Sequence, residues 1–184
     1  VAPKRFVHNV QQLAAVKDRD LFTGWAQNDL PEFLLFIVEC MHNSISRSVT
    51  LNIKGKKKNK VDTLAISCYK MLKRIYSTEY SEIMEMFYGI YVSELSSKNN
   101  KTIHSLTPES YFILDLEIPN QNSTLLDCFD SFTSYEMLEN ENAWFNEKTG
   151  KKEDVKKRIT FWSLPKILII TLKRFSFDGK KKRQ

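Results

Sequence analysis

The sequence is poor in cysteine and glycine, and it has no long hydrophobic run. Its 184 residues include three cysteines, Cys40, Cys68 and Cys128, and no two of them form a C-x-x-C pair. A structural zinc site usually takes four cysteine or histidine ligands in two close pairs. The three scattered histidines do not supply that spacing. Neither zinc nor a disulfide framework is therefore expected, and a reducing intracellular compartment is favoured.

Membrane and secretory segments are also missing from the pattern. No apolar stretch approaches the roughly 20 residues that cross a bilayer. The residues Val1–Phe6 have no apolar region of the kind that a secretory signal carries. We therefore expect no membrane partner. Because the first residue is valine, we also expect the chain to be a processed or excerpted piece of a longer protein.

What the sequence contains is typical of a folded globular domain. Hydrophobic residues make up 42% and charged residues 27%, with a net charge of +6. The charge lies mainly in the lysine-rich runs Lys54–Lys60, Lys148–Arg158 and Lys180–Arg183. Basic runs raise the possibility of nucleic acid or acidic partners, but no aromatic residues interleave them as a stacking platform requires. Solvated loops and strand ends are the simpler interpretation.

Apolar periodicity predicts helices first and mostly strands afterwards, which is an α+β arrangement. Asp29 is a plausible N-cap for the first helix, and Thr124 with Asp127 resembles a capping box. Alternation at Val49, Leu51 and Ile53 favours a hairpin. Helices are expected at Asp29–Ile45, Asp62–Tyr76, Ser81–Phe87 and Thr124–Leu138, strands at Tyr88–Leu95, Tyr111–Ile118, Ala143–Asn146, Val155–Phe161 and Ile167–Phe177, and a polar loop at Ser96–Glu109.

Catalytic motifs are not visible in the residues alone. There is no Gly-rich phosphate loop, no G-x-S-x-G elbow and no H-E-x-x-H helix. Cys68 lies in the middle of an apolar face. Cys40 flanks the apolar face of its own helix, and Cys128 lies in another apolar helix. Packed thiols are favoured over reactive ones.

The run Gln27–Leu34 is similar to the Q-Q-D-A-x-E-F-L motif of ubiquitin-specific proteases, with Asn28 and Pro31 departing from it. In that family the motif opens a thumb helix, and its acidic pair receives the arginines near the C-terminal tail of ubiquitin. By the match these residues are Asp29 and Glu32. Simple capping is the alternative role for both. Carboxylates at a helix N-terminus stay ionised and accept bidentate hydrogen bonds from guanidinium groups.

The run Leu164–Phe175 resembles the family's L-P-x-x-L-x-I-x-L-K-R-F strand, which runs through the palm. The resemblance implies that Phe175 lines the channel for the ubiquitin tail and that Phe177 lies beside it, with ordinary sheet core as the alternative. Further matches occur in the same order at Phe87–Gly89, Tyr111–Ile118 and Leu125–Leu138. Together they imply a papain-like cysteine protease fold in part, with helices first and antiparallel sheet after.

The implied layout is one fragment of a catalytic domain, with thumb helices over about 1–87, fingers over 88–163 and the start of the palm sheet over 164–184. Many relatives bind zinc through two C-x-x-C pairs in the fingers. The corresponding stretches here, Ser93–Glu109 and Trp144–Lys148, contain no cysteine. Zinc is therefore expected to be lost, and Trp144 and Phe145 are expected to hold the fingertips by packing.

The family's nucleophile and histidine segments are not in this chain, so no catalytic residue, metal or cofactor is predicted within it. The favoured function is the ubiquitin-binding part of a deubiquitinase that cleaves after the C-terminal glycine of ubiquitin. One alternative is a catalytically inactive relative with a structural role, for example in a virus particle. A lysine-rich nucleic-acid-binding protein is the third. The expected partner is ubiquitin or ubiquitinated protein, and the expected location is the cytoplasm or a virion.

Overall fold

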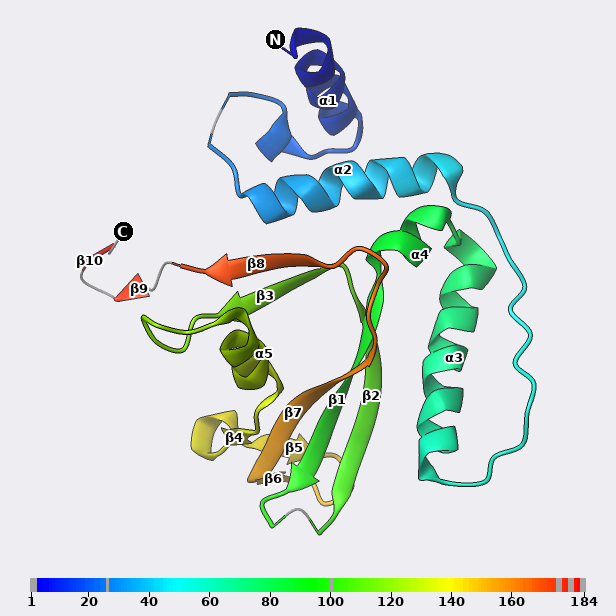
Figure 1. Ribbon diagram of the computed structural model, residues 1–184, viewed down its shortest axis with the longest axis vertical. Helices are drawn as coiled ribbons and strands as arrows, with labels where there is room; N and C mark the ends of the chain where they lie inside the picture. The colour runs from blue at the N-terminus through cyan, green and yellow to red at the C-terminus, as the bar shows by residue number, and fades with distance from the viewer. Residues whose placement is uncertain (1–2, 26, 100, 175–176, 179–180, 183–184) are drawn as a thin grey trace. The chain divides into compact units, whose positions relative to one another are not determined.

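The structure is a computed structural model that describes residues 3–25, 27–99, 101–174, 177–178 and 181–182. It divides into two compact units, Val1–Ser44 and Ile45–Gln184, and each is described here by itself. Figure 1 labels the helices and strands of both.

The first unit consists of α1 (Lys4–Val16), the short 3-10 helix η1 (Asp20–Phe22) and α2 (Leu30–Ile45). Its core joins one buried residue from each element, Ala14, Phe22 and Phe36. The rings of Phe22 and Phe36 stack with centroids 5.0 Å apart. The helix expected from Asp29 to Ile45 is thus confirmed, with Asp29 immediately before it.

The apolar side chains of α2 are buried to different extents. The side that packs on α1 and η1 carries Phe33, Phe36, Ile37 and Cys40. Toward the end of the helix Met41 is 51% exposed and Ile45 is 46% exposed, whereas Val38 and His42 are buried. Periodicity identifies that a helix has an apolar face, but the neighbours that cover it decide which part is buried.

The helices of the second unit are α3 (Lys60–Glu79), α4 (Glu82–Phe87) and α5 (Leu125–Thr133). Each begins at a side-chain cap: Asn59 and Thr124 form capping boxes, and Ser81 accepts from the Met84 amide. These local signals explain why the helix starts are close to those expected. The expected length of the last helix was wrong, because α5 ends at Thr133 and Leu138 lies in a strand.

The main sheet has the strand order β2-β1-β7-β4 and is antiparallel throughout, as expected. Its members are β1 (Gly89–Ser97), β2 (Ile103–Tyr111), β7 (Val155–Ser163) and β4 (Glu136–Leu138). The prediction of a loop over Ser96–Glu109 was wrong, because most of that segment is β2. This strand lies at the sheet edge and is largely exposed, so its residues are polar without being irregular.

A parallel pair joins β3 (Ile113–Glu117) to β8 (Ile169–Lys173). The strand expected at Ile167–Phe177 was too long, because β8 ends at Lys173 and Arg174 lies outside any strand. β8 has five residues, and Leu172 is 43% exposed. In the described part of the chain β8 pairs with β3 alone, so one edge of the strand is not covered by another strand. The shorter pairs are β5 (Trp144–Asn146) with β6 (Lys151–Glu153) and β9 (Phe177–Asp178) with β10 (Lys181–Lys182).

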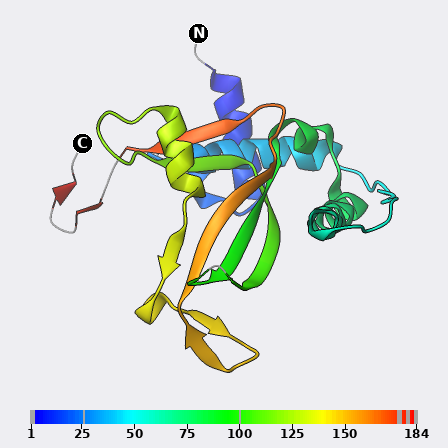
Figure 2. The ribbon, with the colours of Figure 1, turned by 60° about the horizontal axis from the view of Figure 1, so that its bottom comes forward.

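Helices α3 and α5 lie on opposite sides of β1 and β7 (Figures 1 and 2). Cys68 of α3 packs with Ile90 and Val92 of β1. Cys128 of α5 packs with Leu114 and Leu116 of β3, and with aromatic residues of β1, β2 and β7. The packed positions of Cys68 and Cys128 are confirmed, since they are 0% and 3% exposed.

A close backbone approach at Gly89 fixes where β1 begins. A Cβ atom at this position would lie 2.4 Å from the ring of Tyr111, which is opposite Gly89 in the strand register. Only glycine leaves room for the buried tyrosine there. This contact gives a physical reason for the glycine in the Phe87–Gly89 motif.

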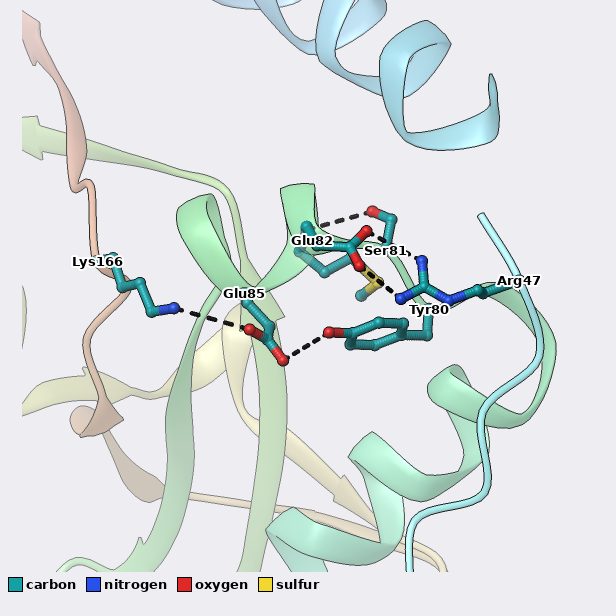
Figure 3. Close-up of polar contacts among 7 residues, drawn as sticks. Arg47, Tyr80, Ser81, Glu82, Glu85 and Lys166 are labelled. Carbon is teal, nitrogen blue, oxygen red and sulfur yellow. Dashed lines mark hydrogen bonds and ion pairs between the residues drawn. The ribbon is translucent and has the colours of Figure 1, made fainter. Parts of the chain in front are cut away.

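The segment between α2 and α3 is not the expected hairpin. The Arg47 amide donates to the Tyr80 carbonyl at 2.8 Å, the Tyr80 amide returns the bond at 2.9 Å, and Val49 donates to Tyr76. Its first residues therefore bond to the end of α3 instead of to each other. The Arg47 guanidinium also binds both carboxylate oxygens of Glu82, and Glu85 accepts from the Tyr80 hydroxyl and contacts Lys166 (Figure 3).

Candidate functional site

The start of α2 presents the two predicted acidic residues. The Asp29 Oδ1 atom accepts the Glu32 amide at 3.2 Å, and the Asp29 carbonyl accepts the Phe33 amide at 3.0 Å. Asp29 is thus the N-cap that the sequence predicts. Both side chains are exposed. One oxygen of Asp29 is occupied by the cap, and the rest of the pair faces solvent.

The residues before α2 are held by contacts with other parts of the first unit. The Gln11 amide group donates to the Gly24 carbonyl at 3.1 Å, and the Thr23 hydroxyl donates to the Asp20 carbonyl at 2.7 Å. The Phe22 ring meets the Phe33 ring of α2 edge-on at 5.5 Å. These contacts tie the segment as far as Gly24 to α1 and pack η1 against the first turn of α2.

The acidic pair has no cationic partner among the residues that the structure describes. The ion pair of unit 1 joins Arg19 to Glu39, with nitrogen and oxygen 3.7 Å apart, further along α2. The first turn of a helix is a favourable place for acidic side chains. Two exposed carboxylates one turn apart, with no ion pair in the described residues, can bind an external guanidinium or ammonium group.

The structure describes only the backbone of one of the two aromatic residues predicted for the site. Phe175 lies outside the described residues. The backbone of Phe177 is in β9, paired with Lys182, and its side chain is outside the description. Both roles stay predictions. Asp29 and Glu32 belong to the first unit and the phenylalanines to the second, so each group is described separately.

An exposed aromatic residue four positions before Asp29 in the chain was missed by sequence reasoning. Trp25 is 86% exposed, and Leu30, the first residue of α2, is 73% exposed. Large apolar side chains in such open positions are characteristic of contact surfaces. The available signal was the tryptophan two positions before Gln27, outside any apolar periodicity.

The cysteines do not resemble activated nucleophiles. Burial raises the pKa of the Cys40 thiol and of the Cys68 thiol above the ordinary value. A nucleophilic cysteine needs the opposite shift, from a nearby cation, a histidine or a helix N-terminus. The burial and raised pKa values of these two thiols fit packing, and the absence of a catalytic residue from this chain stays a prediction.

The loss of zinc from the fingertip stretches stays a prediction. In residues 3–25, 27–99, 101–174, 177–178 and 181–182 there is no cluster of three or more histidine, cysteine, aspartate or glutamate side chains suited to a metal. The hairpin β5–β6 extends past the end of the main sheet (Figure 2). It is tied by Glu153, which accepts from the Asn146 amide group at 2.9 Å and the Thr149 hydroxyl at 2.6 Å.

The hydrogen bonds to Glu153 change the pKa of its carboxyl group, and Trp144 of the same hairpin packs against β2. The bond from Thr149, chiefly, lowers the pKa of Glu153 below its ordinary value. Trp144 contacts His104 of β2, with ring centroids 5.1 Å apart. The expected packing role of Trp144 is therefore supported, whereas Phe145 is 55% exposed and does not anchor the hairpin.

None of the helices in the described ranges is both long enough and apolar enough to cross a membrane.

Comparisons with known proteins agree with these features. The family model described as "Ubiquitin carboxyl-terminal hydrolase" matches residues 1–184. Ubiquitin carboxyl-terminal hydrolase 4 of Candida glabrata is 31% identical over 89% of this chain, and the protein of that name from Arabidopsis thaliana is 26% identical over 96%. The chain spans 19% of the length of the first relative and 47% of the second.

A solved structure supports the fold. The match is to the structure of the SAGA Ubp8/Sgf11/Sus1/Sgf73 DUB module bound to ubiquitin aldehyde, with a TM-score of 0.60 and 22% identity. It covers 92% of this chain and 32% of the matched chain. The expected papain-like fold is confirmed at this level. The relatives are from yeasts and a plant, and nothing among them supports a virus particle.

Proposed function

This chain belongs to the ubiquitin carboxyl-terminal hydrolase family, and from that premise we propose that it is the ubiquitin-binding part of a cysteine-type deubiquitinase. The parent protein hydrolyses the bond after the C-terminal glycine of ubiquitin. Its partners are ubiquitin and ubiquitinated proteins inside the cell. The residues of this chain bind and orient the substrate, and none of them is proposed as the nucleophile or the base.

The observation that carries the proposal is the unpaired acidic start of α2. Asp29 and Glu32 are exposed, ionisable and without a cation partner in the described residues, in a motif position shared with ubiquitin-specific proteases. We propose that these two carboxylates bind the arginines near the ubiquitin tail. A fixed helix start orients the carboxylates before binding, so less conformational entropy is lost when the tail is held.

Phe175 and Phe177 are proposed to line the path of the same tail, and Trp25 adds an apolar contact next to the acidic pair. The proposed layout keeps the thumb over 1–87, the fingers over 88–163 and the start of the palm over 164–184. The hydrogen bonds of Glu153 support a fingertip that folds without zinc.

The test uses the full-length protein and ubiquitin with a thiol-reactive group at its C-terminus. Capping and binding by Asp29 must be separated, so the variant is Asp29→Asn with Glu32→Gln. Asparagine caps a helix about as well as aspartate, so this pair removes charge without removing the cap. Glu39→Gln, an exposed acid on the same helix, is the matched control.

The proposal predicts a covalent adduct with the wild-type and Glu39→Gln proteins. Adduct formation by the Asp29/Glu32 variant should slow by about 100-fold, since two charged hydrogen bonds are lost. Non-covalent binding without an adduct would instead identify an inactive ubiquitin-binding relative. If the protein forms no adduct and does not bind ubiquitin, the proposal is overturned and a structural role remains.

A further inference from the structure

A groove on the second unit is not used by the proposed function. It has a volume of about 740 Å³ and lies between the start of α3 and the β1–β2 edge of the sheet. Its polar rim carries Lys57, Lys60 and Lys101, and its apolar lining carries Leu64, Ile103 and Leu106. Figure 1 shows α3 running alongside β2, with the segment before α3 on the outer side of the helix.

The three lysines come from three separate parts of the fold. Lys57 lies in the segment before α3, Lys60 is the first residue of α3, and Lys101 lies in the turn between β1 and β2. No carboxylate lines the groove, and none of these ammonium groups has an ion-pair partner in the described part of the chain. Their positive charge therefore accumulates along one rim.

The carboxylates nearest in sequence and register are already occupied. Asp62 of α3 accepts the backbone amides of Lys58 and Asn59 at 2.8 Å and 3.1 Å. Glu94, opposite Leu106 in the strand register, binds the Arg158 guanidinium at 2.9 Å. Neither acid forms an ion pair with a groove lysine in the described residues, so the three ammonium groups stay open to an external anionic group.

The lining also carries apolar surface that the fold leaves open. Ile103 is 52% exposed and Leu106 is 38% exposed, and both are in the edge strand β2. An aliphatic floor with a cationic rim is complementary to a peptide that combines carboxylates with an aliphatic side chain. A single-stranded nucleic acid would require aromatic stacking surfaces, and the lining contains no aromatic residue.

We propose that this groove is a docking site for an acidic peptide segment of a partner protein, anchored by an aliphatic side chain between α3 and β2. The lysine rim selects the acidic segment, and Ile103 with Leu106 receives the apolar anchor. The groove shares no residue with the proposed tail site. Failure of the two proposals can be told apart, because the groove is tested by peptide binding and the tail site by adduct formation with ubiquitin.

The test measures fluorescence anisotropy with the full-length protein and a labelled ten-residue peptide. The peptide has eight glutamates and leucines at its fourth and seventh positions. We expect a dissociation constant on the order of 10–100 µM. A peptide of ten glutamates is the probe for charge alone, and a ten-residue oligothymidylate is the probe for nucleic acid.

The variants separate the groove from general positive charge. Replacing Lys57, Lys60 and Lys101 by glutamate should weaken binding about tenfold or more. The matched control replaces Lys54, Lys56 and Lys58, all in the segment before α3, by glutamate, which changes the net charge equally and leaves the groove rim intact. Its binding should change less than about threefold. Ile103→Thr keeps a β-branched residue in β2 and should also weaken binding.

The proposal is overturned if the leucine-containing peptide does not bind, or if both lysine triples weaken binding equally. It is also overturned if the all-glutamate peptide binds as tightly, because the apolar anchor would then have no role. Displacement of the peptide by lower concentrations of oligothymidylate would favour a nucleic-acid site instead. Should the lysine triple fail to fold, Ile103→Thr still decides whether the apolar floor is used.

Discussion

Glu82 and Glu94 of the second unit contrast with the pair Asp29 and Glu32 of the first. In the second unit, Glu94 is bound by Arg158 and Glu82 is bound by Arg47. In the first unit, Asp29 and Glu32 stand exposed at the start of α2 with no cation partner in the described residues. An acid that stabilises a fold has its partner within the fold. An acid pair that is positioned but unpaired is available for a cation on another molecule.

The largest expected effect is on ubiquitin binding when the unpaired acids are neutralised. Asp29→Asn with Glu32→Gln should weaken binding of ubiquitin by about 100-fold, because each lost charged hydrogen bond accounts for roughly a factor of ten. The free energy of unfolding should stay close to wild type, because asparagine retains the cap. Isothermal titration calorimetry and chemical denaturation check the two parts. A drop in stability without a change in affinity would assign these acids to the fold.

The next effect is on stability when a paired acid loses its partner. Glu94 is 9% exposed, so Arg158→Ala leaves a nearly buried carboxylate without its cation. We expect the free energy of unfolding to fall by about 2 kcal/mol, reduced from a fully buried pair because Arg158 is partly exposed. Urea denaturation measures this. Replacing Glu94 and Arg158 together by leucine should recover most of the loss. An equal loss in the double variant would show that the charge pair is not the cause.

A smaller effect should appear as pH dependence at the Arg47–Glu82 pair (Figure 3). The hydrogen bond from Arg47, chiefly, lowers the pKa of Glu82 from 4.5 to about 2. Because the folded-state pKa is depressed, the stabilisation is present above pH 4.5 and is lost as the pH falls toward 2. Thermal melting of wild type and Glu82→Gln should therefore differ at neutral pH and converge in acid. A difference that is independent of pH would contradict this origin.

The smallest effect is expected at the exposed pair Arg19–Glu39. Its atoms are 3.7 Å apart, and both side chains are about half exposed, so solvent screens their attraction. Glu39→Gln should leave both the melting temperature and ubiquitin affinity within error of wild type. A clear loss of affinity would extend the binding surface further along α2 than the account allows.

Local chemistry explains which parts of the fold are predictable from sequence. The caps at Asp29, Ser81 and Thr124 act within three residues, so the starts of α2, α4 and α5 are visible in the sequence. The stop of α5 at Thr133 and the edge strand β2 depend on neighbours distant in the chain. The same holds for the segment after α2, whose amides bond to α3 instead of forming a hairpin.

The candidate site divides in the same way. Asp29 and Glu32 could be found because a short motif and a cap coincide. The Glu94–Arg158 pair joins residues 64 positions apart, and the groove rim joins three separate segments. Pairing across a sheet brings such residues together, and no local pattern encodes that pairing. The exposure of Trp25 is likewise a property of the folded unit.

The most direct test of the central claim is a double-mutant cycle between α2 and the ubiquitin tail. Wild-type protein and the Asp29→Asn/Glu32→Gln variant are each titrated with normal ubiquitin and with ubiquitin whose tail arginines are replaced by alanine. If the acids bind those arginines, either change alone should weaken binding, and the second should add little once the first is made. Fully additive losses would show that the acids and the arginines do not meet, and would contradict the account.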